Sequence, residues 1–90
     1  MDNTRALEIE GLKVTVDTEK TGSWQAFKLL RKSFEAESDL EQFDVMIKLM
    51  EFATDQTEDS IVEFCGGDNA QFLDVVKIVS QIVSGCYPKN

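Results

Sequence analysis

The sequence predicts a mainly α-helical small domain, a bundle of about four helices with an N-terminal β-hairpin. Three observations lead to this prediction. Two short segments near the N-terminus alternate apolar and polar residues, as strands do. Four later segments repeat apolar residues at helical spacing, and capping residues and glycines stand at their ends. The 90 residues are enough for a single domain, residues 1–90, with a thin hydrophobic core.

The hairpin is predicted over about residues 7–16, because two alternating segments flank the dipeptide Glu10-Gly11. A two-residue turn there would put the apolar residues of both strands on one face. It would also place Glu8 opposite Lys13, a favourable cross-strand pair. Gly11 supplies the positive φ that such a turn needs. A longer turn with a bulge at Gly11 is the alternative.

A polar connector over residues 17–22 leads to the first predicted helix, residues 23–36, with Ser23 or Thr21 as its N-cap. One face of this helix is aromatic, and we expect that face to lie in the core. The residues on it are Trp24, Phe27, Leu30 and Phe34, with the stem of Arg31 laid along the rings.

The second predicted helix covers residues 39–53 and begins at the capping-box pattern Ser38 to Glu41. It is apolar around most of its circumference. Outside its main apolar stripe lies a second flank, formed by Val45, Leu49 and Phe52. A helix of this kind must be covered on two sides. Either it is the central helix of the bundle, or a partner protein covers the second flank.

A short third helix is predicted over residues 58–65, with Thr57 as its N-cap. Gly66-Gly67 should end it, because glycine adopts the left-handed conformation without strain.

The fourth helix is predicted over residues 69–84, with Asp68 as its N-cap and Gln71 at the third position. Gly85 and Pro88 should end it. The segment is rich in β-branched residues, which favour strands. Its polar residues nevertheless recur at helical spacing over more than three turns, and this period favours a helix.

The predicted core is built from the apolar faces of these helices. Its residues are Trp24, Phe27, Leu30, Phe34, Phe43, Ile47, Met50, Phe72, Val75, Val79 and Ile82.

The composition excludes several classes of function. The net charge is −8, and an acidic domain repels phosphate, so we expect no direct binding of nucleic acid. The chain has no histidine, which removes the common catalytic pairs and histidine–metal sites. Its two cysteines, Cys65 and Cys86, are too few for a structural zinc site; we expect them reduced, with a disulfide as the less favoured alternative. We therefore expect no cofactor, no metal and no enzymatic activity.

The expected location is the cytoplasm. The chain contains no apolar run long enough for a transmembrane helix, so no membrane association is expected. Its first residues also lack the basic region and apolar stretch of a signal peptide.

The order of segments provides a functional hypothesis. The hairpin segment Leu7-Glu8-Ile9-Glu10-Gly11-Leu12-Lys13-Val14 opens the chain, and a connector leads to Ser23-Trp24-Gln25-Ala26-Phe27-Lys28-Leu29-Leu30. Acidic helices and a last amphipathic helix follow. In this layout, which covers most of the chain, it resembles the tail assembly chaperones of long-tailed (siphovirus-type) bacteriophages. The resemblance implies a non-enzymatic protein of the bacterial host cytoplasm. Such chaperones coat the tape-measure protein, recruit tail-tube subunits and leave before the tail is finished.

A chaperone of this kind needs a moderate apolar patch on a charged body. The candidate partner-binding residues are those that lie off the main helical stripes: Leu29, Val45, Leu49, Phe52 and Leu73. Alternatively, these five cover one another or the apolar face of the hairpin. A rival function is a small acidic adaptor or inhibitor that binds a basic partner through charge. A third possibility is a homodimer whose second apolar face is covered by its own copy.

Overall fold

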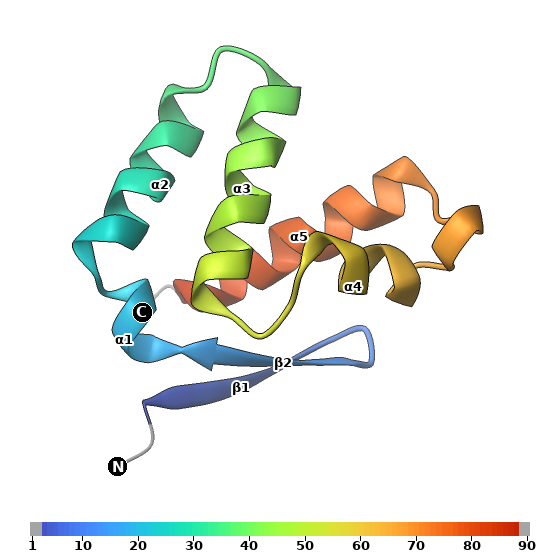
Figure 1. Cartoon of the computed structure of the whole chain (residues 1–90), viewed down its shortest axis with the longest axis horizontal. Coiled ribbons are helices and arrows are strands. Elements are labelled where there is room, and N and C mark those ends of the chain that lie inside the picture. Colours follow the sequence, from blue (N-terminus) through green and yellow to red (C-terminus); the bar gives the residue numbers. More distant parts are fainter. Residues whose placement is uncertain (1–2, 89–90) are drawn as a thin grey trace.

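The computed structural model describes residues 3–88, and its chain runs from a two-stranded hairpin into a series of helices (Figure 1). The elements are β1 (Thr4–Ile9), β2 (Leu12–Asp17), α1 (Thr18–Thr21), α2 (Trp24–Glu35), α3 (Asp39–Ala53), α4 (Glu58–Phe64), the 3-10 turn η1 (Gly67–Asn69) and α5 (Phe72–Cys86). The predicted fold class, a mainly helical domain with an N-terminal hairpin, is confirmed.

The hairpin has the predicted two-residue turn and the predicted register. Glu10 and Gly11 both have positive φ, at 50° and 93°, so the turn contains no bulge residue. The antiparallel pairs include Glu8 with Lys13, as expected. The strands extend further than predicted, because Thr4 also pairs with Asp17.

The polar connector between the hairpin and α2 is a one-turn helix, α1, which the sequence reading missed. The carboxylate of Asp17 accepts hydrogen bonds from the backbone N–H groups of Glu19 and Lys20, at 3.0 and 3.1 Å. This N-cap turns the chain sharply at the end of β2. Ser23 then caps α2 as predicted, accepting from the backbone N–H of Ala26 at 3.1 Å.

The segment after α3 is bonded to the hairpin. Thr54 forms an isolated antiparallel bridge with Val16. The side-chain amide of Gln56 is buried; it donates to the carbonyl oxygen of Lys13 at 3.2 Å and accepts from the Ser60 hydroxyl at 2.8 Å. These bonds fix the connection between α3 and α4 against β2.

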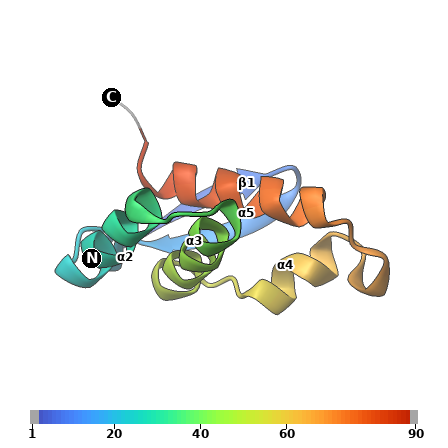
Figure 2. The same cartoon turned by 90° about the horizontal axis from the view of Figure 1, so that it is seen from above.

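The helices lie over the hairpin, and α5 crosses behind α3 (Figures 1 and 2). The α2–α3 pair stands up from this crossing, so that its far end extends beyond α5. The core lies where β2, α3, α4 and α5 meet. Its buried apolar residues are Val14, Val16, Ala26, Ile47, Leu49, Met50, Ala53, Ile61, Ile78, Val79, Ile82, Val83 and Cys86.

The bounds of α5 correct the sequence prediction at both ends. The helix begins at Phe72 rather than residue 69, because the chain first forms η1 and then extends at Ala70 (ψ 137°). Asp68 therefore does not cap it, and Gln71 occupies the N-cap without a side-chain bond. Gly85 lies inside the helix instead of ending it. A Cβ at this position would stand 2.7 Å from a methyl carbon of Leu7, so the glycine lets the hairpin approach closely.

The predicted core is partly confirmed and partly wrong. Ile47, Met50, Val79 and Ile82 are buried, and Leu30, Phe43 and Val75 pack half-buried against the core. The aromatic residues expected there are exposed instead: Trp24, Phe27, Phe34 and Phe72.

On α2 the core prediction was wrong because a different face of the helix packs against the rest of the domain. Its buried residues are Ala26 and Ser33, whose small side chains allow α2 to pack closely on α3. The Ser33 hydroxyl donates to the carbonyl oxygen of Leu30 at 2.9 Å, so it is satisfied in the interface.

Candidate interaction surface

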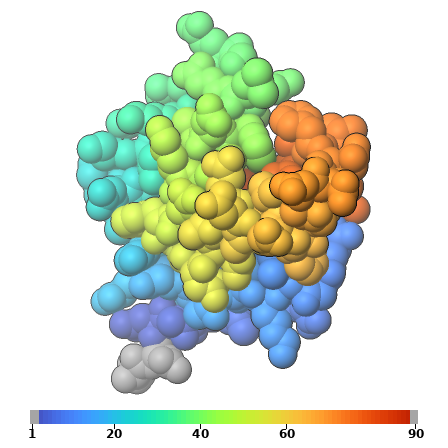
Figure 3. All heavy atoms as spheres, turned by 45° about the vertical axis from the view of Figure 1, so that its right-hand side comes forward, coloured from blue at the N-terminus to red at the C-terminus, as the bar shows by residue number. Residues whose placement is uncertain are grey.

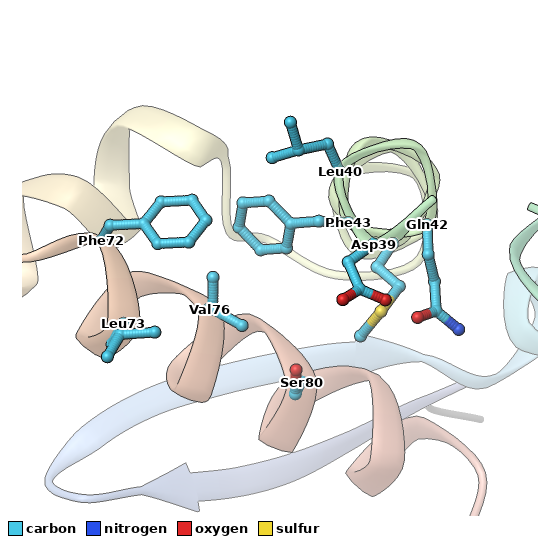
Figure 4. Close-up of a pocket in the computed structure, with 9 residues that line it drawn as sticks. Asp39, Leu40, Gln42, Phe43, Phe72, Leu73, Val76 and Ser80 are labelled. Carbon is cyan, nitrogen blue, oxygen red and sulfur yellow. The ribbon is translucent and has the colours of Figure 1, made fainter. Parts of the chain in front are cut away.

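A groove opens between α3 and the first half of α5. Its volume is about 280 Å³, and Figure 4 shows side chains from both helices gathered around it. In the space-filling view a hollow separates the first turns of α3 from those of α5 (Figure 3). The lining residues are Asp39, Leu40, Gln42, Phe43, Met46, Phe72, Leu73, Val76 and Ser80.

The groove continues beneath the end of α2. A second hollow, of about 260 Å³, is lined by Leu30, Ser33, Phe34, Gln42, Met46, Val83, Ser84 and Tyr87. Gln42 and Met46 line both hollows, so the two meet at α3. We call the combined surface the α5 groove, since α5 supplies residues along its whole length.

The floor of the α5 groove is one face of a single helix. The residues on this face recur every three or four positions: Phe72 and Leu73, whose exposed side chains also form part of the rim, then Val76, Ser80, Val83 and Ser84, and Tyr87. Val76, Ser80 and Ser84 form a track of small side chains at a spacing of four. A partner helix can approach such a track closely, because no bulky ridge keeps its backbone away. At 1.5 Å per residue, the floor is roughly 22 Å long.

The rim of the groove is made of large apolar side chains that nothing in the described chain covers. Leu40 is 65% exposed, Phe72 60% and Leu73 75%. The rings of Phe43 and Phe72 meet edge to face, with their centroids 6.2 Å apart, across the space between α3 and α5. Clustered apolar side chains of this kind mark a site of protein contact.

The groove contains few ionisable side chains. Asp39 is the one carboxylate among its lining residues. The Tyr87 hydroxyl donates to the carbonyl oxygen of Thr21 at 3.0 Å, which ties the end of α5 to α1. Burial, and to a lesser degree the neighbouring Cys86, raises the pKa of Tyr87 above its ordinary value of 10.0.

The two cysteines are free thiols with raised pKa values. Burial raises the pKa of Cys86, against the opposing effect of Arg5. Burial and the nearby carboxylates of Asp74 and Glu10 raise that of Cys65. Neither thiol is activated as a nucleophile. Within residues 3–88, no three histidine, cysteine or acidic side chains are grouped as metal ligands would be.

The predicted partner-binding residues do not form one surface patch in the structure. Leu49 is 1% exposed and lies in the core, so it is not a surface residue; this corrects the expectation. Leu29 and Phe52 are half-buried against the core, and the Lys20 ammonium lies 5.5 Å from the Phe52 ring centre. Val45 is half-buried on α3. For Leu49, the alternative interpretation of a central bundle helix is therefore correct.

Leu73 alone among the predicted partner-binding residues lies in the α5 groove, where its side chain is largely exposed. The sequence reading missed Leu40 and assigned Phe72 to the core. Both stand at the first turn of a helix, where the neighbouring elements leave more than half of each side chain exposed. This position at a helix end is the signal that could have distinguished them.

Comparisons with known protein families, with curated proteins and with solved structures give no match. In the part of the chain that the structure describes, no helix is long and apolar enough to span a membrane.

Proposed function

We propose that this chain is a non-enzymatic tail assembly chaperone of long-tailed bacteriophages, and that its α5 groove holds a helical segment of the tape-measure protein. The observation that carries the proposal is the groove itself, with its small-residue floor and exposed rim of Leu40, Phe72 and Leu73. The tape-measure protein is named as the partner because of the resemblance in the order of segments, and the groove is the surface that would bind it.

The groove suits a helix better than an extended peptide or a small molecule. Its floor follows one helix for roughly four turns, the length over which a partner helix presents its i, i+3, i+4 and i+7 apolar residues. An extended peptide would need an accessible strand edge, and the groove is lined by helices.

The rest of the molecule suits the same role. A tape-measure protein exposes a long apolar helical surface before the tail tube encloses it. A chaperone with a net charge of −8 would keep the complex dissolved in the host cytoplasm through like-charge repulsion between complexes. Recruitment of tail-tube subunits follows from the resemblance and would use a surface outside the groove.

The test is binding of overlapping helical segments of the phage tape-measure protein to dilute chaperone, followed by fluorescence anisotropy. Leu73→Ser and Leu40→Ser should each weaken binding at least tenfold, because each removes an exposed apolar contact while leaving the fold intact. Phe64→Ser is the matched control, since Phe64 is a partly exposed aromatic residue outside the groove. Equal affinity of both groove variants and the wild type would contradict the proposal.

Salt dependence separates this proposal from the rival one, an acidic adaptor or inhibitor that binds a basic partner. Eight acids lie between residues 37 and 60 against Lys48 alone. If they carried the binding, affinity would fall steeply with added salt, whereas binding through an apolar groove depends on salt only weakly. A steep fall, with Leu73→Ser silent, would favour the adaptor.

A further inference from the structure

The two edges of the β-hairpin differ in what covers them. The outer edge of β2 is closed by the segment after α3, where Thr54 forms a bridge with Val16. The backbone N–H of Thr15 donates to the Asp55 carboxylate at 3.0 Å, and the Thr15 carbonyl oxygen accepts from the backbone N–H of Asp55 at 3.1 Å. β1 forms the other edge of this two-stranded sheet, and the start of β1 is the lowest element in Figure 1.

The outer edge of β1 carries backbone groups that find no partner in the described chain. Ile9 and Leu12 flank the two-residue turn and therefore exchange hydrogen bonds. The alternation along β1 then directs the N–H and C=O groups of Ala6 and Glu8 away from β2. Thr15 lies opposite Ala6, and its backbone groups also point outward, as its bonds on the β2 side require. In the part of the chain that the structure describes, no hydrogen bond outside the hairpin ladder reaches the backbone of Ala6 or Glu8.

The side chains along this edge form two different rows. On the helix side, Leu7 is half-buried against the core. On the outer face lies a hollow of about 480 Å³, which is lined by Ala6, Leu7, Glu8, Lys13, Val14 and Thr15. The Glu8 side chain is exposed, and no ion pair joins its carboxylate to Lys13 opposite it or to another described residue. The outer row therefore offers space beside the small Ala6 side chain and an unneutralised carboxylate at Glu8.

We infer that the outer edge of β1 binds an extended, basic segment of another protein as a third, antiparallel strand. The segment carries a lysine or arginine opposite Glu8, a large apolar side chain opposite Ala6 that fills the hollow, and a β-branched residue opposite Leu7. This binding site goes beyond the proposed function, because no residue of β1 lines the α5 groove. The edge and the groove can hold two partners at the same time.

The backbone of β1 selects the conformation of the partner. Outward N–H and C=O groups that recur at every second residue match those of another strand, so an extended polypeptide satisfies them along the whole edge. A helix keeps its backbone groups for itself and leaves the edge unsatisfied. The antiparallel direction gives the slightly more stable pairing per residue.

The side chains of β1 exclude a second copy of this chain as the matching partner. Consider any antiparallel register that joins the outward backbone groups of two β1 strands. Glu8 then lies opposite Thr4, Ala6 or Glu8 of the other copy, and none of these is basic. Two copies with a net charge of −8 each also repel one another. A basic segment of a different protein removes both obstacles.

The experiment uses the full chain and a synthetic peptide of about seven residues, one more than β1 contains. The fluorescein-labelled peptide has a lysine, a valine and a phenylalanine at the positions opposite Glu8, Leu7 and Ala6. Fluorescence anisotropy should show saturable binding. Amide hydrogen exchange followed by NMR should slow at least tenfold at Ala6 and Glu8 when the peptide binds. The N–H of Leu7 should not change, because β2 already protects it.

Two changes separate the charge from the backbone bonds. Glu8→Lys should weaken binding of the peptide at least tenfold. The matched control is Glu37→Lys, the same change of charge at an exposed residue of the α2–α3 connection, and it should bind nearly like the wild type. Methylation of the peptide nitrogen opposite Ala6 should also weaken binding at least tenfold, because the peptide loses a backbone donor. This second change leaves the protein untouched, so it cannot act through misfolding.

Four results would overturn the inference. One is the absence of saturable binding at millimolar peptide, and another is equal affinity of Glu8→Lys and the wild type. A third is loss of binding in Leu73→Ser without protection of Ala6 and Glu8, which would place the peptide in the α5 groove. The fourth is protection of both amides in the chain alone at high concentration, which would show that a second copy covers the edge. The proposed function is measured separately, with tape-measure segments and groove variants.

Discussion

The hairpin side of the molecule and the groove side use apolar residues in opposite ways. Toward the hairpin, Val14 and Val16 are buried against the helices, and Arg5 and Gln56 tie the elements together by hydrogen bonds. Toward the groove, large side chains stand at helix ends with nothing from the described chain over them. The apolar side chains of the hairpin strands are covered within the described chain, whereas those at the groove rim are exposed, as the proposed binding role requires.

In a small domain of this kind, the residues that stabilise the fold and the residues free to bind a partner lie on different sides. A chain of this length can complete one core, and the apolar surface left over is free to serve a partner. Substitutions on the hairpin side should therefore change stability, and substitutions on the groove side should change association.

The largest effect is expected for Leu49→Ala. Leu49 is fully buried in α3, so its truncation removes apolar contacts and leaves a cavity, at a cost of about 2–5 kcal/mol. The measurement is the free energy of unfolding in urea. The same truncation at the groove rim, Leu73→Ala, should cost less than about 0.5 kcal/mol, because the side chain is already in water. Similar losses at both positions would remove the distinction between the two sides.

The second prediction concerns the bond between the hairpin and the last helix. One guanidinium nitrogen of Arg5 donates to the carbonyl oxygens of Gly85 and Cys86, at 2.7 and 3.3 Å, at the C-terminal end of α5. These oxygens have no partner within the helix, so the cation satisfies them and complements the helix dipole. Arg5→Met should cost about 1.5–3 kcal/mol, since it removes charge-assisted bonds and keeps most of the apolar stem.

Chemical denaturation of the Arg5→Met variant checks this value. Lys13→Met is the control, because it removes an exposed cation of the same hairpin that has no side-chain bond to a helix. A loss no greater than the control's would mean that the Arg5 bonds contribute nothing measurable.

The third prediction is a loss of stability at alkaline pH. The folded-state pKa values of Cys86 and Tyr87 lie above their ordinary values of 9.0 and 10.0, because burial penalises the charged forms. The stability that these groups contribute is therefore complete below about pH 9 and is lost as pH rises through the raised values. Urea unfolding at about pH 7.5 and about pH 10.5 should show the decrease, and the double variant Cys86→Ala, Tyr87→Phe should show a smaller one. An equal decrease of stability in the double variant would mean that groups other than Cys86 and Tyr87 cause the loss at alkaline pH.

The sequence predicted the elements better than it predicted the surroundings of each side chain. The hairpin register follows from strict alternation and from the conformational needs of its turn, both of which are local. The caps at Ser23 and Thr57 are local as well. The start of α5 was wrong because Asp68 resembles a cap, but the two glycines before it, with φ of 122° and 64°, lead the chain into a separate turn.

The candidate site was harder to predict, since periodicity identifies an apolar face but not what covers it. On α3, Leu49 stood off the main stripe and was expected to be free, yet the helix is covered on both sides. On α2, the aromatic residues formed the obvious stripe and were expected to be buried, yet Ala26 and Ser33 face the core. Close helix packing selects small side chains over large ones, and this choice depends on the neighbouring helix, which a single-helix pattern does not contain.

The smallest expected effect on stability is that of Trp24→Ser, and it tests the orientation of α2 directly. Because the Trp24 ring lies mostly in water, its loss should change the free energy of unfolding by no more than about 0.5 kcal/mol in dilute solution. Ala26→Leu is the matched change on the opposite face of the helix. Ala26 is fully buried, so the added carbons should overpack the interface with α3 and cost about 1–3 kcal/mol. If the aromatic residues faced the core instead, the order of the two costs would be reversed, and urea unfolding of these two variants would reveal it.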